Sequence, residues 1–170
     1  NFNDIEPILP CDYDYVLLIG VFEYGQSYIP TETPFEDFLN INQKHVKKDG
    51  NLVIAIENKM GMKYWAGCVE DHLSQFFAGI EDYPDGGVVR TFTRGGFEKL
   101  FAKCGISDYH FYYPYPDYKF ADTIYSDRRL PKVGELSKNL RNFDADRMLL
   151  FDEKNVFDMV IREGIFPMCS

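Results

Sequence analysis

The pattern of apolar and polar residues predicts alternating strands and helices in the first third of the chain. Residues 15–19 (YVLLI) and 52–56 (LVIAI) are continuous apolar runs, which is typical of parallel strands that are buried on both faces. Between them, residues 33–36 (TPFE) predict the start of a helix, with threonine as N-cap, proline in the first helical position and glutamate completing a capping box. A strand, a helix and a strand at this spacing predict a right-handed βαβ unit.

The rest of the chain predicts two more helices and a hairpin. Residues 93–104 carry apolar side chains on one side and are followed by Gly105, which favours a helix stop. Residues 108–113 and 120–125 flank a PYPD turn and predict two antiparallel strands. Residues 152–163 predict an amphipathic helix that ends at Gly164. We therefore expect an α/β fold with a mainly parallel sheet that ends in an antiparallel β-hairpin.

Glycine, acidic and aromatic residues follow both apolar runs. The first run continues into Gly20, Val21, Glu23 and Tyr24, and the second continues into residues 57–65 (ENKMGMKYW). In open α/β sheets, ligands bind beyond the carboxyl ends of the strands, and glycine lets the backbone approach a ligand closely. We therefore expect both segments to line one ligand-binding crevice.

Composition and charge narrow the class of protein. The 170 residues are 45% apolar and 16% aromatic, as expected for one packed domain. There are 27 acidic and 18 basic residues, a net charge of −9, which argues against a nucleic-acid partner and, less strongly, against anionic lipid. The sequence shows neither an apolar run long enough to cross a membrane nor a signal-peptide pattern. Four widely spaced cysteines without a CxxC pair predict reduced thiols and a cytoplasmic protein: Cys11, Cys68, Cys104 and Cys169.

Four short motifs occur in one order along the chain: IGVFEY, AIENKMGMKYWAG, EDH and YYPYPDY. Together with the predicted strands and hairpin, they resemble the class I S-adenosylmethionine-dependent methyltransferase domain of large bacterial proteins associated with surface polysaccharide synthesis. The resemblance covers roughly residues 4–131 and implies the carboxyl half of a Rossmann-like methyltransferase fold. Residues 132–170 are then expected to form a helical extension or the start of a following segment.

The cofactor loop of that family is missing from this chain. The family carries an acidic-Gly-x-Gly-x-Gly turn after its first strand, whereas the glycine pairs at 86–87 and 95–96 lack a strand before them and a helix after them. The chain also opens on Asn1 rather than on methionine. We therefore expect a fragment of a longer protein that is inactive alone.

The resemblance implies S-adenosylmethionine as cofactor and assigns residues to it. Asp4 and Ile5 fall where such enzymes contact the adenine, although a polar chain terminus would look the same. Gly20, Val21 and Tyr24 fall beside the methionine part of the cofactor, and the alternative is a plain strand end. The motif GVFEY replaces the Asn-Pro-Pro-Tyr type, which disfavours methylation of nucleobase amines and leaves transfer to oxygen or carbon open.

Acidic residues and one histidine are the candidates for catalysis on the acceptor side. Transfer to a hydroxyl often uses a base, and we select His72 and Glu57 from a set that also includes Glu70 and Asp71. The alternative for His72 is a histidine at a helix start, capped by Glu70 and Asp71. Neighbouring carboxylates and a histidine can bind a divalent ion, but three consecutive residues do not converge on one ion, so we predict no metal site. Cys68 shows no sign of activation as a nucleophile.

Aromatic residues supply the candidates for binding the acceptor. Tyr113 and Tyr115 could stack against a sugar, or they could pack on the sheet as part of a rigid hairpin. Trp65 could cover the acceptor as a lid or fill the core beneath its loop.

Two functions of different classes remain open. The first is methyl transfer to a hydroxyl or carbon of a carbohydrate-related or other small acceptor. The alternative is a non-catalytic α/β module that serves assembly within a larger polysaccharide-synthesis protein. A sheet without its first strands also exposes an edge beside residues 15–19, so a homodimer through that edge is possible.

Overall fold

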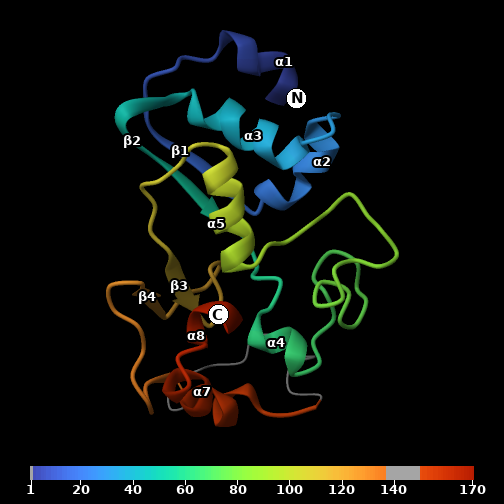
Figure 1. The fold of residues 1–170 in the computed structure, drawn as a ribbon, viewed down its shortest axis with the longest axis vertical. Coiled ribbons are helices and arrows are strands. Elements are labelled where there is room, and N and C mark those ends of the chain that lie inside the picture. The colour runs from blue at the N-terminus through green and yellow to red at the C-terminus, as the bar shows by residue number, and fades with distance from the viewer. Residues whose placement is uncertain (1, 137–149) are drawn as a thin grey trace.

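The computed structural model describes residues 2–136 and 150–170 (Figure 1). Residues 137–149 of the predicted extension lie outside this part of the chain. The elements are, in chain order, α1 (Phe2–Ile5), the 3-10 helix η1 (Glu6–Ile8), β1 (Tyr13–Ile19), the 3-10 helix η2 (Phe22–Tyr24), α2 (Gly25–Tyr28), α3 (Pro34–Gln43), β2 (Val46–Ala55), α4 (Met62–Trp65), α5 (Arg94–Lys103), β3 (Tyr112–Tyr115), β4 (Thr123–Ser126), α7 (Glu153–Arg162) and α8 (Phe166–Cys169).

Strands β1 and β2 form a parallel pair, with α3 between them in sequence. Leu17 pairs with Val53 and Ile19 pairs with Ala55. The adjacent parallel strands predicted from the two apolar runs are therefore confirmed, and β2 begins six residues earlier than its apolar run. Because the strands are parallel, their carboxyl ends lie at the same edge of the sheet.

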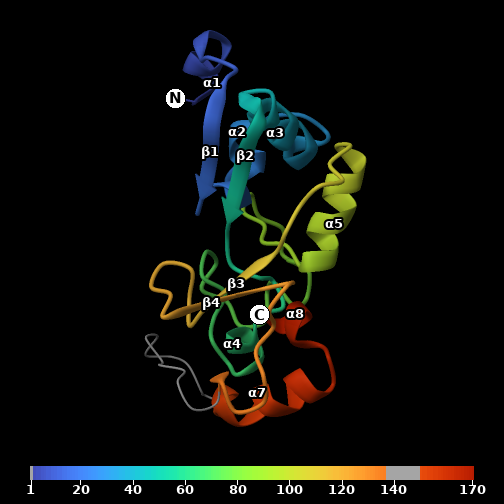
Figure 2. The ribbon, with the colours of Figure 1, turned by 90° about the vertical axis from the view of Figure 1, so that its left-hand side faces the viewer.

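Strand β1 is covered on one face only, so the prediction of burial on both faces is wrong. Leu18 is 6% exposed, whereas Tyr15, Leu17 and Ile19 on the other face are 63%, 60% and 47% exposed. Helices α3 and α5 lie on one side of the strand pair (Figure 2), and no element among the described residues packs on the other side. A continuous apolar run cannot distinguish these two situations, because burial depends on what the rest of the fold supplies.

An aromatic core joins the strand pair to α3 and α5. Phe22 is fully buried, and its ring centroid lies 5.7 to 5.9 Å from those of four other phenylalanines. Phenylalanine buries a large apolar area, and tilted or offset ring pairs add to its stabilisation. This core consists of Leu18, Phe22, Ile29, Phe35, Phe38, Leu39, Phe97 and Leu100.

The helix starts follow the sequence, although one cap differs in its bonds. Helix α5 has Thr93 as N-cap, whose hydroxyl accepts a hydrogen bond from the backbone N of Gly96 at 2.9 Å. Helix α3 follows Thr33 as predicted, but the Thr33 side chain makes no cap bond. Its hydroxyl instead donates to Asp37 at 3.2 Å, and Glu36 pairs with Lys103 at 2.8 Å. The predicted capping box is therefore wrong, because Thr33 bonds to a side chain in its own helix and Glu36 pairs with a residue of α5.

Strands β3 and β4 form the predicted antiparallel hairpin, but with shifted limits. Tyr113 pairs with Tyr125, and pairing starts four residues later than the predicted residue 108. In the described part of the chain the hairpin forms its own two-stranded sheet rather than the end of the parallel one. The fold is thus mixed α/β, with a parallel pair and a separate hairpin.

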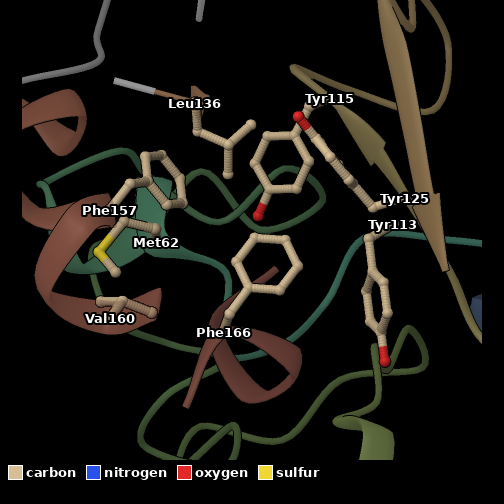
Figure 3. Close-up of a cluster of buried hydrophobic side chains, with 8 residues drawn as sticks. All are labelled: Met62, Tyr113, Tyr115, Tyr125, Leu136, Phe157, Val160 and Phe166. Carbon is tan, nitrogen blue, oxygen red and sulfur yellow. The ribbon is translucent and has the colours of Figure 1, made fainter. Parts of the chain in front are cut away.

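The hairpin packs against the carboxyl-terminal helices through a second core (Figure 3). The rings of Tyr115, Phe157 and Phe166 meet there, with centroids 5.5 and 5.6 Å from that of Tyr115. This core unites both sides of the predicted boundary at residues 131 and 132, and the domain division stays a prediction. Its buried members are Met62, Tyr113, Tyr115, Tyr125, Leu136, Phe157, Val160 and Phe166.

The cysteines and the lengths of the helices bear on the expected class of protein. All four cysteines are free thiols, as predicted, and Cys104 is only half-buried. Within residues 2–136 and 150–170, no helix combines the length and the apolar character that crossing a membrane requires.

Candidate functional site

A cavity of about 350 Å³ lies at the carboxyl ends of the parallel strands. It occupies the place where the sequence predicts a ligand-binding crevice, with the turn of the β3–β4 hairpin forming the opposite wall. The lining residues are Ile19, Gly20, Glu23, Tyr24, Glu57, His72, Tyr118 and Lys119.

Gly20 turns the chain from β1 into this cavity. Its φ is +62°, and its backbone N donates to the carbonyl of Ala55 at 2.8 Å. A Cβ at this position would lie 3.1 Å from the hydroxyl oxygen of Tyr118. Only glycine adopts this backbone conformation without strain while leaving room for the tyrosine. The sharp turn is what directs the following acidic residue toward the cavity.

Glu23 is the residue that sequence reasoning missed. It lies in η2 beside Phe22, whose burial in the aromatic core anchors the turn. Its side chain is 2% exposed, Oε1 lies 3.7 Å from His72 Nε2, and Oε2 is buried without a hydrogen-bond partner among the described residues. The sequence pattern that could have identified it is an acidic residue between two aromatic residues directly after a predicted strand. Such a position is often buried, and buried carboxylates are rare unless they are paired.

Glu57 follows β2 and faces the same cavity. Its side chain is 5% exposed, and Oε1 accepts a hydrogen bond from Lys119 Nζ at 2.8 Å. Oε2 is buried and, among the residues that the structure describes, has no partner. The ion pair raises the pKa of Lys119 despite the opposing effect of its burial, so Lys119 stays charged.

His72 is held between two glutamates. Nδ1 lies 3.1 Å from Glu70 Oε1, and Nε2 faces Glu23. The carboxylate of Glu23 and the hydrogen-bonded carboxylate of Glu70 raise the pKa of His72 to about 10, against the effect of burial. The imidazole is therefore charged at neutral pH and donates a hydrogen bond to Glu70, whereas a general base has to be neutral. The catalytic role of His72 stays a prediction. The Tyr24 ring meets it edge-on at 5.5 Å.

Glu70 is itself fixed by the irregular loop around it. Oε2 accepts from the backbone N of His72 and of Leu73, both at 2.7 Å. The hydroxyl of buried Tyr83 lies 3.5 Å from Oε1 and accepts from the backbone N of Thr91 at 2.9 Å. Residue 72 lies in a turn rather than at a helix start. The Glu70 side chain therefore caps the backbone N–H groups of a turn and not those of a helix. Such a network holds the imidazole in one orientation.

Asp71 points away from this group. It pairs with Lys63 at 2.7 Å and accepts a hydrogen bond from the hydroxyl of Tyr64. Adjacent side chains in an extended or turn segment diverge, which is why Asp71 does not join its neighbours Glu70 and His72.

The structure separates the residues that the resemblance assigns to the cofactor. Gly20 and Tyr24 line the cavity, whereas Val21 packs against the aromatic core. Asp4 and Ile5 lie in α1, which Figures 1 and 2 show near the amino ends of the strands. These two residues therefore do not reach the cavity.

The aromatic candidates for acceptor binding also lie apart. Trp65 in α4 is 40% exposed and does not line the cavity. Tyr113 and Tyr115 belong to the second core, where they also line a smaller cavity of about 140 Å³. The hydroxyl of Tyr113 donates to Asp127 at 2.7 Å. Their packing agrees with the rigid-hairpin alternative.

Three side chains from distant parts of the sequence converge on one point. One ligand atom from each of Glu23, Glu57 and His72 lies within 4.8 Å of the others. Two carboxylates and one imidazole are a donor set that can hold a divalent ion.

Comparison with family models, with curated proteins and with solved structures finds no match to this chain. Conclusions about its function therefore rest on the geometry of the site.

Proposed function

We propose that this chain forms the acceptor side of a site for S-adenosylmethionine-dependent methyl transfer to a hydroxyl or carbon of a carbohydrate-related or other small molecule. The observation that carries the proposal is the cavity at the carboxyl ends of two adjacent parallel strands, which is lined by Gly20 and Tyr24 from the segment after β1 and by Glu57 from the segment after β2. Ligands bind at this edge in open α/β sheets.

Four residues that line the cavity would have separate roles in this reaction. Gly20 gives a ligand access to the backbone, and Tyr24 borders the same space, as the family resemblance implies for the methionine part of the cofactor. S-adenosylmethionine supplies the methyl group as part of a sulfonium. Glu57, with one buried oxygen that lacks a partner, can accept a hydrogen bond from an acceptor hydroxyl. While no ion is bound, His72 is charged and faces Glu23, so it does not remove a proton.

Methyl transfer from radiolabelled S-adenosylmethionine to hydroxylated carbohydrates tests the proposal. The protein should be the longer chain that carries the glycine loop expected upstream. Gly20→Ala should lower the rate by about tenfold or more, because its Cβ would lie 3.1 Å from the hydroxyl oxygen of Tyr118 and force that side chain to shift within the cavity. Gly105→Ala is the matched control, since its φ is +71° and its Cβ meets open space. Absence of cofactor binding by the longer chain would refute the proposal.

One observation favours the alternative of a non-catalytic assembly module. Tyr15, Leu17 and Ile19 expose an apolar stripe on β1, and exposed apolar patches often mark interaction surfaces. A longer chain that binds no cofactor but assembles through this face would support the module.

A further inference from the structure

We propose that Glu23, Glu57 and His72 bind one divalent transition-metal ion of the Mn²⁺ to Zn²⁺ series, with open coordination positions that face the 350 Å³ cavity. The site shares Glu57 and His72 with the acceptor side of the proposed function and includes none of the predicted cofactor contacts. Its existence does not depend on methyl transfer.

The first argument is the pair of unpartnered carboxylate oxygens. Oε2 of Glu23 and Oε2 of Glu57 are both buried and find no hydrogen-bond partner in the described part of the chain. Burying a carboxylate is unfavourable unless a cation or a donor compensates it. Lys119 compensates one oxygen of Glu57 only. A cation in the cavity would compensate both remaining oxygens.

The second argument is the orientation of the histidine. Glu70 accepts a hydrogen bond from His72 Nδ1 at 3.1 Å, so Nε2 points toward Glu23. Histidine ligands of metals typically donate their other ring N–H to a carboxylate, which fixes the ring and the tautomer. Glu70 is in turn held by two backbone N–H groups. On binding, the Nε2 proton leaves to solvent and the ion takes its place.

The third argument is the geometry. Ligand atoms at about 2.0–2.2 Å from a tetrahedral metal lie about 3.3–3.6 Å apart, and the three atoms here lie within 4.8 Å of one another. Nε2 of His72 and Oε1 of Glu23 are already 3.7 Å apart, and a closure of about 1 Å or less brings all three atoms to these distances. Lys119 has a half-exposed side chain and can turn outward when the ion arrives.

The donor set and the open positions indicate which ion binds. Two carboxylates with one imidazole suit Mn²⁺, Fe²⁺ or Zn²⁺ better than Ca²⁺, which takes oxygen ligands. Three protein ligands leave positions for water or for an oxygen of a bound molecule, as in catalytic rather than structural sites.

Titration with MnCl₂ alone, followed by electron paramagnetic resonance of the free ion, tests the site. We expect one Mn²⁺ per chain, and binding at least about tenfold weaker in Glu23→Gln, His72→Gln and Glu70→Gln. Glu98→Gln is the matched control, because Glu98 pairs with Arg94 on the surface of α5, and its affinity should equal that of the wild type. Unchanged affinity in Glu23→Gln would overturn the proposal, as would no saturable binding below about 1 mM.

A second measurement on the wild-type chain tests the site even if the variants do not fold. Electron spin echo spectroscopy of Mn²⁺ bound to the wild-type chain should show coupling to an imidazole nitrogen. Binding without that coupling would place the ion elsewhere and overturn the proposal. Because no methyl donor is present in either experiment, failure here leaves the proposed methyl transfer unaffected.

Discussion

Stability should fall with rising pH because of His72, and the effect can be worked from the structure. Its pKa of about 10 in the folded protein lies above the 6.5 of a free imidazole. The folded state therefore holds a proton that the unfolded state releases. The stabilisation from this charge is complete below pH 6.5 and is lost as the pH rises through 10.

The groups around His72 determine the size of this effect. Glu23, Glu57 and Glu70 face the imidazole, and burial followed by the charge of Glu23 raises the pKa of Tyr24, which keeps that ring neutral below pH 10. One proton bound only in the folded state lowers the free energy of unfolding by about 1.4 kcal/mol per pH unit. From pH 7 to pH 9, His72 should account for a loss of about 3 kcal/mol.

Urea unfolding of the wild type and of His72→Gln at pH 7, 8 and 9, with a chelator present, measures this loss. The wild type should lose stability more steeply than the variant, and the two should approach each other toward pH 10. Equal slopes for both proteins would refute the reasoning. If His72→Gln does not fold, NMR titration of the wild-type imidazole decides, and a midpoint near 6.5 would refute it equally.

Three further predictions follow from packing and charge. Phe22→Ala should lower the free energy of unfolding by about 3–5 kcal/mol, because the ring is fully buried, whereas Phe76→Ala should change it by less than about 0.5 kcal/mol because Phe76 is 54% exposed; similar losses in urea unfolding would contradict the described core. Leu17→Lys should weaken self-association measured by sedimentation velocity, since it charges the exposed face of β1; a wild type that stays monomeric at high concentration would rule out the predicted dimer. Thiol titration of the unreduced, denatured protein should count four free groups, and a count of two or fewer would show that disulfides form.

Local sequence was sufficient to predict most of the elements. The parallel strand pair, the helices that begin after Thr93 and Asp152, and the hairpin all occur near their predicted positions. Their signals are short-range: apolar runs, N-cap side chains and turn residues act within a few positions of the chain. The limits of the hairpin were less predictable, because pairing depends on which residues the second core buries.

The candidate site was predictable in place but not in composition. The rule for open α/β sheets located the cavity at the strand ends, and Gly20, Tyr24, Glu57 and His72 line it. Glu23 was overlooked because its burial depends on Phe22 docking among phenylalanines from α3 and α5, which are distant in sequence.

Tertiary structure alone decided the charge of His72 and the face that β1 exposes. A histidine near Glu70 in sequence could act as a base or as a cation, and the approach of Glu23 from η2, added to the hydrogen bond with Glu70, makes it a cation. Likewise, the apolar run of β1 specifies a strand, but its burial depends on which elements pack against each face. Charge and burial are properties of the whole three-dimensional environment, whereas strand and helix formation are largely properties of neighbouring residues.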